Sequence, residues 1–259
     1  MSDELTVERC GRVLVVTIDR QERMNSLSPE VKDGLLETWT SLKTDRSVRS
    51  ILITGAGTRA FCTGMDLKAF AERGGPSPVK ADVHEELRVT PLHCDVWLPT
   101  IVAINGVCTG AGLHFIADAD VVVASATASF LDTHVSVGQV TAIEPITLLP
   151  RIGLGNALRL AVLGKHGRMS AEEALRISLV DEVVEPERLL DRAIELAEHS
   201  ATGSPAAVEA SKRAIRSALE RPMAQAMQYG WELLLAHRSH PDSNEGPIAF
   251  AEKREPTWQ

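Results

Sequence analysis

The segment INGVCTGAGLHFIADAD, residues 104 to 120, joins an apolar run to a helix-like segment through a glycine-rich turn. Its glycines follow the pattern G-x-x-x-G-x-G, at Gly106, Gly110 and Gly112, and His114 comes two residues later. The first N–H groups of a helix lack intrahelical partners and carry partial positive charge. The segment therefore predicts a strand-turn-helix unit whose turn can bind an anion or a carbonyl oxygen that gains charge.

A similar segment lies earlier in the chain. The stretches ILITGAGTRAFCTGMDLKAF (51 to 70) and TIVAINGVCTGAGLHFI (100 to 116) both run from a strand-like sequence through Cys-Thr-Gly into an apolar segment. The residues after the second glycine of these two turns are Met65 and Ala111, and we expect both to present backbone N–H groups. Two amides directed at one oxygen would form an oxyanion hole.

The first half of the chain is rich in strand-like runs, and the second half is helical. The expected strands, short and rich in Val and Ile, are residues 12–18, 49–55, 100–106 and 120–126. Ser28 before Pro29, and Ser170 with Glu173, are typical of helix starts. From about residue 186 onward, apolar residues recur at helical spacing. The sequence predicts an α/β core over residues 1–199 and a helical C-terminal region over residues 200–259.

The composition excludes several classes of protein. The chain has 259 residues, 44% hydrophobic residues and a net charge of -8, with no long basic run, so we expect no nucleic-acid partner. We also expect no membrane association, because no run approaches the roughly 18 apolar residues of a membrane span and the N-terminus is polar, which favours a cytoplasmic protein. The four cysteines lack metal-ligand spacing, so we expect buried free thiols and no metal.

The glycine pattern also invites a dinucleotide-binding interpretation. A similar loop in short-chain dehydrogenases follows the first strand, and a Tyr-x-x-x-Lys pair supplies the acid and base. Here the loop begins at residue 106, the single tyrosine is Tyr229, and Leu233 stands four residues later. The sequence therefore disfavours a nicotinamide cofactor.

Several segments together resemble the enoyl-CoA hydratase/isomerase, or crotonase, family. They are RQERMNSLS (20 to 28), AFCTGMDLKAF (60 to 70), INGVCTGAGL (104 to 113), the stretch from 153 to 184, and AFAEKREPTW (249 to 258). The resemblance covers almost the whole chain. It implies a core of repeated ββα turns, a helical C-terminal region that forms a homotrimer or hexamer, and an acyl-CoA thioester whose carbonyl oxygen lies between the amides of Met65 and Ala111. Coenzyme A would be part of the substrate, with no permanently bound cofactor.

This sequence departs from the hydratase pattern where chemistry happens. Hydratases of the family use two glutamates, and these would align with His114 and His134. The resemblance implies proton transfer by this pair, with His114 as the neutral base or water-holding group, because a helix N-terminus disfavours its cation. His134 would be the acid. If residues 129–135 are extended, Asp132 lies on the same face as His134 and orients its imidazole, and Glu144 is a further candidate carboxylate.

The resemblance also suggests residues that bind coenzyme A. They are Arg23, Met65, Asp66, Leu67 and Lys253. Asp66 is equally explained as a helix cap, and Lys253 as part of a solvated terminal helix.

Three functions of different classes remain. The first is an acyl-CoA lyase or isomerase of fatty acid metabolism that stabilises an enolate, with weak standard enoyl-CoA hydration because histidines replace the glutamates. The second is a hydrolase that cleaves a carbon-carbon bond of a β-dicarbonyl substrate, as some crotonase relatives do with pocket histidines. The third is an acyl-CoA binding protein without catalysis. Loss of turnover in His134→Ala would be expected of either enzyme, binding without turnover of the third function, and two acidic or ketonic products of the hydrolase alone.

Overall fold

The computed structural model describes residues 4–66 and 82–259 of the chain. Its main sheet has six strands in the spatial order β1 (Leu5–Cys10), β2 (Val13–Ile18), β3 (Ser50–Gly55), β5 (Thr100–Ile104), β7 (Val121–Ser125) and β10 (Glu182–Val184). The β1 and β2 strands form an antiparallel hairpin, whereas every later neighbour pairs in parallel. The four strands expected from runs of Val and Ile are confirmed as β2, β3, β5 and β7.

A smaller sheet lies at the carboxyl ends of the parallel strands. Its strands, in spatial order, are β4 (Ala60–Cys62), β6 (Val107–Thr109), β8 (Ser129–Leu131) and β9 (Met169–Ser170). The chain passes from β3 to β4, from β5 to β6 and from β7 to β8 by short turns. This alternation confirms the expected crotonase-like core of repeated ββα turns.

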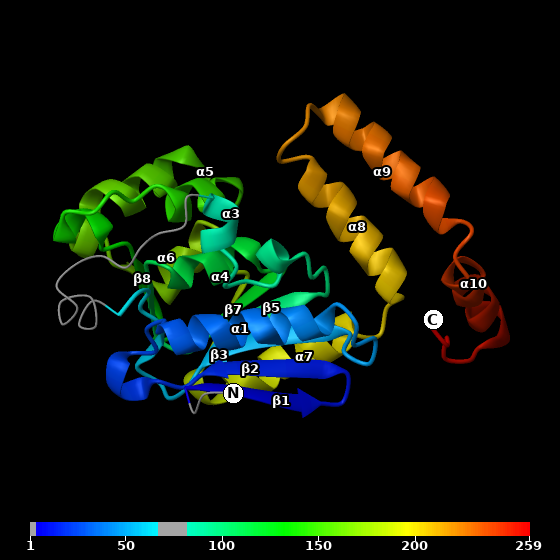
Figure 1. The fold of residues 1–259 in the computed structure, drawn as a ribbon, viewed down its shortest axis with the longest axis horizontal. Helices are drawn as coiled ribbons and strands as arrows, with labels where there is room; N and C mark the ends of the chain where they lie inside the picture. Colours follow the sequence, from blue (N-terminus) through cyan, green and yellow to red (C-terminus); the bar gives the residue numbers. More distant parts are fainter. Residues whose placement is uncertain (1–3, 67–81) are drawn as a thin grey trace.

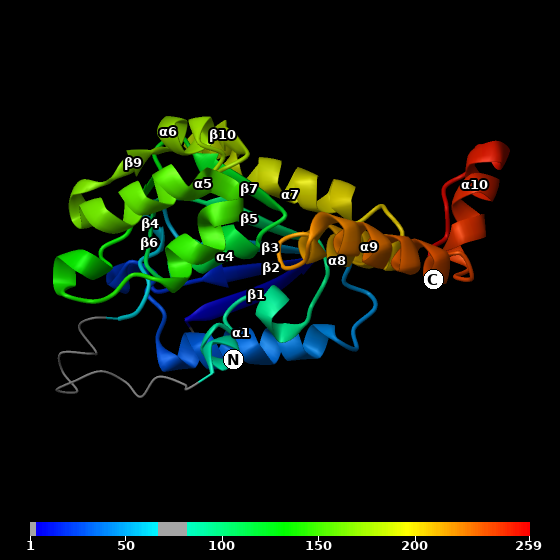
Figure 2. The ribbon, with the colours of Figure 1, turned by 90° about the horizontal axis from the view of Figure 1, so that it is seen from above.

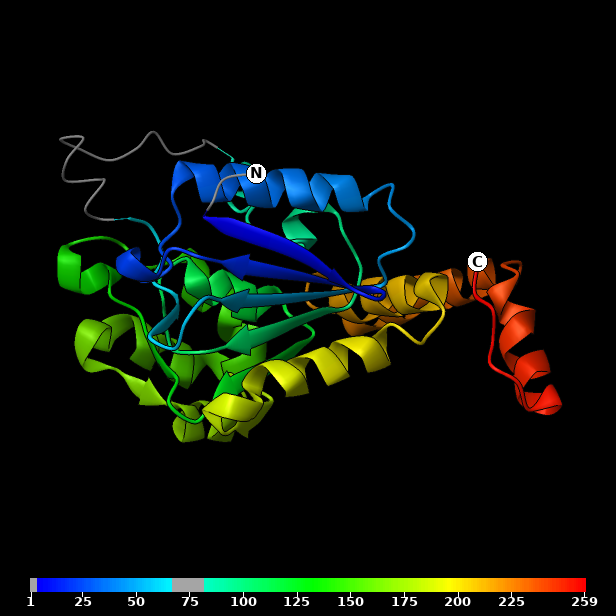
Figure 3. The same cartoon turned by 90° about the horizontal axis from the view of Figure 1, so that it is seen from below.

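Helices cover both faces of the main sheet. Their bounds are α1 (Pro29–Leu42), α3 (Val83–Glu86), α4 (Gly112–Asp118), α5 (Ile143–Leu163), α6 (Ala171–Arg176), α7 (Leu189–Ser200), α8 (Pro205–Ser217), α9 (Met223–His237) and α10 (Asp242–Glu252). Short 3-10 turns are η1 (Gln21–Arg23), η2 (Leu92–Cys94), η3 (His134–Val137), η4 (Gly164–His166) and η5 (Pro186–Arg188). Figure 3 shows the sheet between α1 and α7.

Alternating side chains of one strand reach two different cores. Ile51 and Ile53 of β3 pack in the cluster that contains Trp39 of α1, whereas Leu52 packs in the cluster that contains Ala193 of α7. Successive strand residues point to opposite faces, so a nearly continuous apolar strand is what a sheet buried on both faces requires. This burial holds the carboxyl ends of the strands, and the turns that follow them, in fixed positions.

The last three helices form an arm that extends from the sheet. In Figures 1 and 2, α8 and α9 run beside each other, and α10 lies at the far end from α5. The α8 helix begins where Ser204 accepts a hydrogen bond from the N–H of Ala207. A helical C-terminal region is therefore present, as expected.

The helix starts agree with the sequence in most respects. The Ser28 hydroxyl accepts from the N–H of Val31, and that of Ser170 accepts from the N–H of Glu173, as N-caps do. The Glu173 carboxylate instead pairs with Arg159, so the reciprocal half of a capping box is replaced by an ion pair.

Two expectations from the composition need correction. Cys10 is exposed because it ends an edge strand, while Cys62, Cys94 and Cys108 are buried, and all four thiols are free. The helical stretch 143–166 is long and apolar enough to span a membrane by length and composition, so the expectation that no segment reaches this length is wrong. Gly153 interrupts the helix with a φ of 70°, and such stretches also occur in soluble proteins.

Candidate active site

The two Cys-Thr-Gly turns lie side by side. Strands β4 and β6 pair in parallel with Cys62 opposite Cys108, so equivalent residues of the two turns are neighbours. Gly64 has a φ of +81°, and a Cβ built there would lie 3.0 Å from the amide nitrogen of Ala111. A side chain at this position would therefore push against that amide. Within residues 4–66 and 82–259, no backbone oxygen accepts a hydrogen bond from the N–H of Met65 or of Ala111.

Side-chain amides hold the first turn against the sheet. The Asn25 amide donates to the carbonyl oxygens of Ala56 and Ala60, at 3.0 and 2.7 Å. The Asn105 side chain donates to the Ala60 carbonyl at 3.0 Å. The N–H of Leu27 donates to the carbonyl of Gly64 at 2.7 Å. The backbone that carries Met65 is thus fixed before any ligand arrives.

The Asp132 carboxylate holds the His134 imidazole. Asp132 Oδ1 lies 2.8 Å from His134 Nδ1 and also accepts from the His134 backbone N–H at 2.9 Å. The other oxygen, Oδ2, accepts from the Thr141 hydroxyl at 2.8 Å. The predicted pairing of Asp132 with His134 is present, but its predicted extended geometry is wrong, because β8 ends at Leu131 and His134 begins η3. A turn closed by the Asp132 side chain takes the place of the strand.

The second carboxylate lies between the two histidines. Glu144 Oε1 is 3.4 Å from Nε2 of His114 and 3.8 Å from Nε2 of His134. Both His114 and Glu144 are buried, and the His134 side chain is 29% exposed. Glu144 enters from the first turn of α5, and His114 from the first turn of α4, as its sequence position predicts. The chain therefore brings three titratable groups together from separate elements.

This cluster lies against the second glycine-rich turn. Gly110 has a φ of +55°, and a Cβ built on it would lie 3.7 Å from Cε1 of His134. Gly110 directly precedes Ala111, the N-cap of α4. The backbone that leads into Ala111 and the imidazole of His134 are therefore neighbours.

The charges of the cluster follow from its contacts. The hydrogen bond to Asp132 raises the pKa of His134 above 6.5, against the effect of partial burial. Burial acts to raise the pKa of Asp132, but hydrogen bonds from His134 and Thr141 lower it overall. Burial likewise opposes the ionisation of Glu144, yet the hydrogen bond from His114 lowers the pKa of that carboxyl. The arrangement favours two carboxylates and a protonated His134, which is a proton donor beside a proton acceptor.

Of the described residues expected to bind coenzyme A, only Lys253 lies far from the turn that carries Met65. Arg23 is half-buried at the end of η1, four residues before Leu27, which forms a β-bridge with Met65. The Asp66 carboxylate pairs with Arg20 Nη2 at 3.2 Å. Lys253 ends α10, which Figure 1 shows at the far end of the helical arm. Leu67 lies outside the described residues.

The structure adds two groups that pattern alone did not single out. Thr141 supports Asp132 from nine residues away, and Arg20, which is buried, also pairs with Glu4 at 2.8 Å. Thr141 belongs to no recognisable motif. Arg20 is the first residue of the segment RQERMNSLS (20 to 28), and that position is the signal that could have found it.

Comparison with known proteins places this geometry in a family. Residues 8–259 match the family model described as enoyl-CoA hydratase/isomerase. The chain is 36% identical to (E)-benzylidenesuccinyl-CoA hydratase from Thauera aromatica, over 98% of both chains. It is 34% identical to carnitinyl-CoA dehydratase from Escherichia coli K12, over 100% of this chain and 99% of the relative.

Experimental structures of other proteins in this family have the same fold. An enoyl-CoA hydratase/isomerase from Mycobacterium paratuberculosis superposes with a TM-score of 0.89 at 34% identity, covering 100% of this chain and 98% of the other. Enoyl-CoA hydratase from Mycobacterium tuberculosis gives 0.88 at 33% identity, with 100% and 99% covered. The paired turns, the parallel sheets and these similarities agree, and the chain belongs to the enoyl-CoA hydratase/isomerase (crotonase) family of acyl-CoA-processing enzymes.

Proposed function

We propose that the protein is an acyl-CoA lyase that adds water to, or removes water from, the acyl chain of a CoA thioester through an enolate. The observation that carries the proposal is the position of Glu144 Oε1 between Nε2 of His114 and Nε2 of His134. Hydration needs one group that takes a proton from water and another that gives a proton to the α-carbon. A carboxylate beside an imidazole with a raised pKa meets both needs.

The amides of Met65 and Ala111 are proposed to bind the thioester oxygen. Support comes from the pairing of the two turns, from the closeness of Gly64 to the amide of Ala111, and from the lack of a backbone acceptor for either N–H in the described residues. As the enolate forms, negative charge moves onto this oxygen. Fixed donors stabilise that charge without reorganisation, an effect worth about 3 kcal/mol for each donor.

His134 is proposed as the acid, and Glu144, supported by His114, as the base that holds water. Asp132 keeps Nδ1 of His134 engaged, so Nε2 is the nitrogen that exchanges a proton with the substrate. His114 donates to Glu144 and fixes the carboxylate toward the pocket. In a pair of catalytic glutamates the acid is a neutral carboxyl group. Here the proposed acid, His134, is a cation.

The acyl group is proposed to differ from that of crotonyl-CoA. Support comes from two relatives, a benzylidenesuccinyl-CoA hydratase and a carnitinyl-CoA dehydratase. A site with imidazoles in place of two carboxylates positions water differently, so rapid hydration of a short, unsubstituted enoyl group is not expected.

A single variant series tests the proposal. Wild-type protein and His134→Ala are given crotonyl-CoA and a panel of 2-enoyl-CoA thioesters with longer or aryl-substituted chains, and binding is followed by thermal shift in the same samples. We expect the variant to bind acyl-CoA with similar affinity and to lose turnover of every substrate on which the wild type acts. Equal rates in the two proteins would refute the role of His134.

A second function is favoured by one observation. Asp132 and His134 form a fixed imidazole-carboxylate pair of the kind that activates water for attack on a carbonyl. A β-diketone hydrolase would use that pair to cleave a carbon-carbon bond. Mass spectrometry of the products distinguishes the two, because the lyase changes the thioester by one water and the hydrolase releases two smaller fragments.

We also propose that the chain assembles as a homotrimer or a hexamer. Several large apolar side chains of the helical arm are exposed in a single chain, including Ile215 at 73%, Met227 at 68% and Trp231 at 53%. Exposed apolar surface of this extent is typical of subunit interfaces. Light scattering coupled to size-exclusion chromatography measures the mass directly, and a monomer would contradict the proposal.

A further inference from the structure

A cleft of about 610 Å³ lies at the end of the main sheet opposite the candidate active site. Its walls come from the loop 43–49 before β3, the loop 95–99 before β5, and the first turns of α8. The glycine-rich turns follow the carboxyl ends of those two strands. The β3 strand has six residues and β5 has five, and each extended residue adds about 3.3 Å along the strand. The cleft and the active site are therefore roughly 15 to 20 Å apart.

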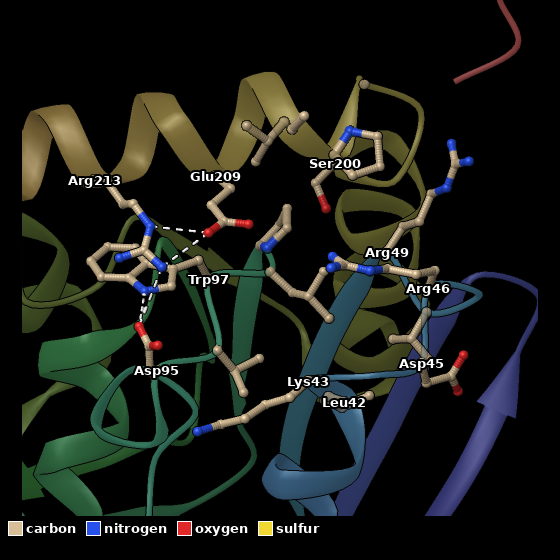
Figure 4. Close-up of a pocket in the computed structure, with 18 of the residues that line it drawn as sticks. Leu42, Lys43, Asp45, Arg46, Arg49, Asp95, Trp97, Ser200, Glu209 and Arg213 are labelled. Atoms are coloured by element: carbon tan, nitrogen blue, oxygen red, sulfur yellow. Dashed lines mark hydrogen bonds and ion pairs between the residues drawn. The ribbon is translucent and has the colours of Figure 1, made fainter. Parts of the chain in front are cut away.

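The carboxylates on one side of the cleft share one cation. Arg213 Nη2 lies 3.3 Å from Asp95 Oδ1 and 3.0 Å from Glu209 Oε1. The Trp97 indole N–H donates to the same Asp95 oxygen, and the Arg213 guanidinium stacks 4.3 Å from the centre of the Trp97 ring. Figure 4 shows this group together, across the cleft from Arg46 and Arg49. One guanidinium therefore pairs with two carboxylates, and an incoming anion is expected on the opposite side of the cleft.

The remaining acidic group of the lining, Asp45, is also engaged. Its Oδ1 accepts from the backbone N–H of Ser47 at 2.9 Å, and its Oδ2 lies 3.7 Å from Arg9 Nη1. These contacts lower the pKa of Asp45 and keep it ionised, but its charge is balanced by a cation that is not part of the cleft lining.

Three cations of the lining have no such balance. Lys43, Arg46 and Arg49 form no ion pair with any carboxylate in the part of the chain that the structure describes. Arg49 Nη2 donates to the carbonyl of Trp258 at 3.3 Å, while Nη1 is buried and finds no hydrogen-bond acceptor among the described residues. A buried guanidinium nitrogen without an acceptor costs free energy, so the Arg49 side chain gains stability if it turns outward to an oxyanion in the cleft.

From this charge distribution we infer that the cleft binds a small organic phosphate, with its phosphate group on Arg46 and Arg49. A phosphate monoester carries close to two negative charges at neutral pH, and the arginine fork matches its oxygens. The apolar side chains of Val48, Val96 and Leu98 offer a surface for the organic part. The volume lies within the roughly 300 to 1,000 Å³ typical of small-molecule sites.

Calorimetric titration with two probes tests this site. Phenyl phosphate presents both a phosphate and an apolar ring, and inorganic phosphate presents the dianion alone. We expect phenyl phosphate to bind the wild type and inorganic phosphate to bind more weakly. Arg46→Gln and Arg49→Gln should each weaken phenyl phosphate binding by at least about tenfold, since each removes a charge-assisted hydrogen bond. Arg176→Gln, which removes an exposed charge outside the cleft, should leave the affinity unchanged.

Two outcomes would overturn the inference. They are the absence of phenyl phosphate binding at millimolar concentration, and unchanged affinity in both Arg46→Gln and Arg49→Gln, which would place the probe outside the cleft. Arg46 is exposed and carries no structural hydrogen bond in the described residues, so its variant keeps the test valid if Arg49→Gln does not fold. Tighter binding of inorganic phosphate than of phenyl phosphate would contradict the proposal that the cleft binds an organic phosphate. The cleft would then be a site for free phosphate only.

Discussion

Nδ1 of His134 lies 2.8 Å from Oδ1 of Asp132, a carboxylate whose side chain is completely buried. The same carboxylate accepts from the His134 backbone and from Thr141, so three hydrogen bonds fix it. A fixed carboxylate orients the imidazole and leaves Nε2 directed toward Glu144, 3.8 Å from its Oε1. The chemistry proposed for this protein depends on that orientation.

Replacing Asp132 by Asn should lower kcat by about 100-fold or more, because the imidazole loses the partner that fixes its tautomer and raises its pKa. Activity that requires protonated His134 declines as the pH rises through the pKa of that group. In Asp132→Asn this decline should move to lower pH. The pH profile of kcat measures the shift, and an unchanged profile would mean that the protonation of His134 does not limit the rate.

The stability of the protein should depend on pH through His134. Its folded pKa is raised above 6.5, so its ion pair stabilises the fold fully below about pH 6.5, and that contribution is lost as the pH rises through the folded pKa. Urea unfolding of wild type and His134→Gln at about pH 5.5 and about pH 9 should therefore give a larger difference in free energy at the lower pH. Each unit of raised pKa contributes about 1.4 kcal/mol. A larger difference at the higher pH would reverse the assigned sign.

Glu144→Gln should lower kcat by about 100- to 10,000-fold and change KM little, since the amide keeps the shape of the side chain but cannot accept a proton. Glu187→Gln changes an exposed glutamate on η5 and serves as the matched control. Steady-state kinetics with the best thioester substrate separates kcat from KM. A rise in KM at constant kcat would assign Glu144 to binding.

Gly64→Ala should reduce turnover by about 100-fold, because the new Cβ would lie 3.0 Å from the amide of Ala111 and push it from its position. The positive φ of Gly64 adds a backbone cost of about 1 to 3 kcal/mol. Gly11→Ala is the control, since Gly11 also has a positive φ but has no atom within 4 Å of a built Cβ. If both variants lost the same activity after correction for stability, crowding of the amide would play no part.

Local sequence patterns predicted the strands and helix starts that carry the site, for physical reasons. Residues 51–53 are apolar at successive positions because both faces of the parallel sheet are buried, and this pattern can be read directly from the sequence. The repeated Cys-Thr-Gly turns predicted equivalent positions for Met65 and Ala111 after two strands, and the pairing of β4 with β6 places the two turns side by side. Short-range sequence patterns were therefore sufficient to predict these strands and turns.

Long-range contacts were less predictable. Glu144 comes from the start of α5, and only the folded chain places its carboxylate beside His114. Strand β8 stops at Leu131 because the Asp132 side chain captures the backbone of His134, a competition that periodicity does not record. Short strands such as β9 exist because neighbouring strands pair with them, with little support from their own sequence.

The most direct measurement is the exchange of the α-proton of a saturated thioester, butyryl-CoA, in deuterated water, followed by mass spectrometry. Exchange requires only the enolate-stabilising amides and a proton-transfer group, so it does not depend on knowing the natural acyl group. The account predicts exchange by the wild type and its loss in His134→Ala, which lacks the group assigned to the α-carbon. Glu144→Gln, which lacks the group assigned to water, should keep the exchange. Wild-type protein that binds butyryl-CoA without exchanging its α-proton would contradict the proposed enolate chemistry.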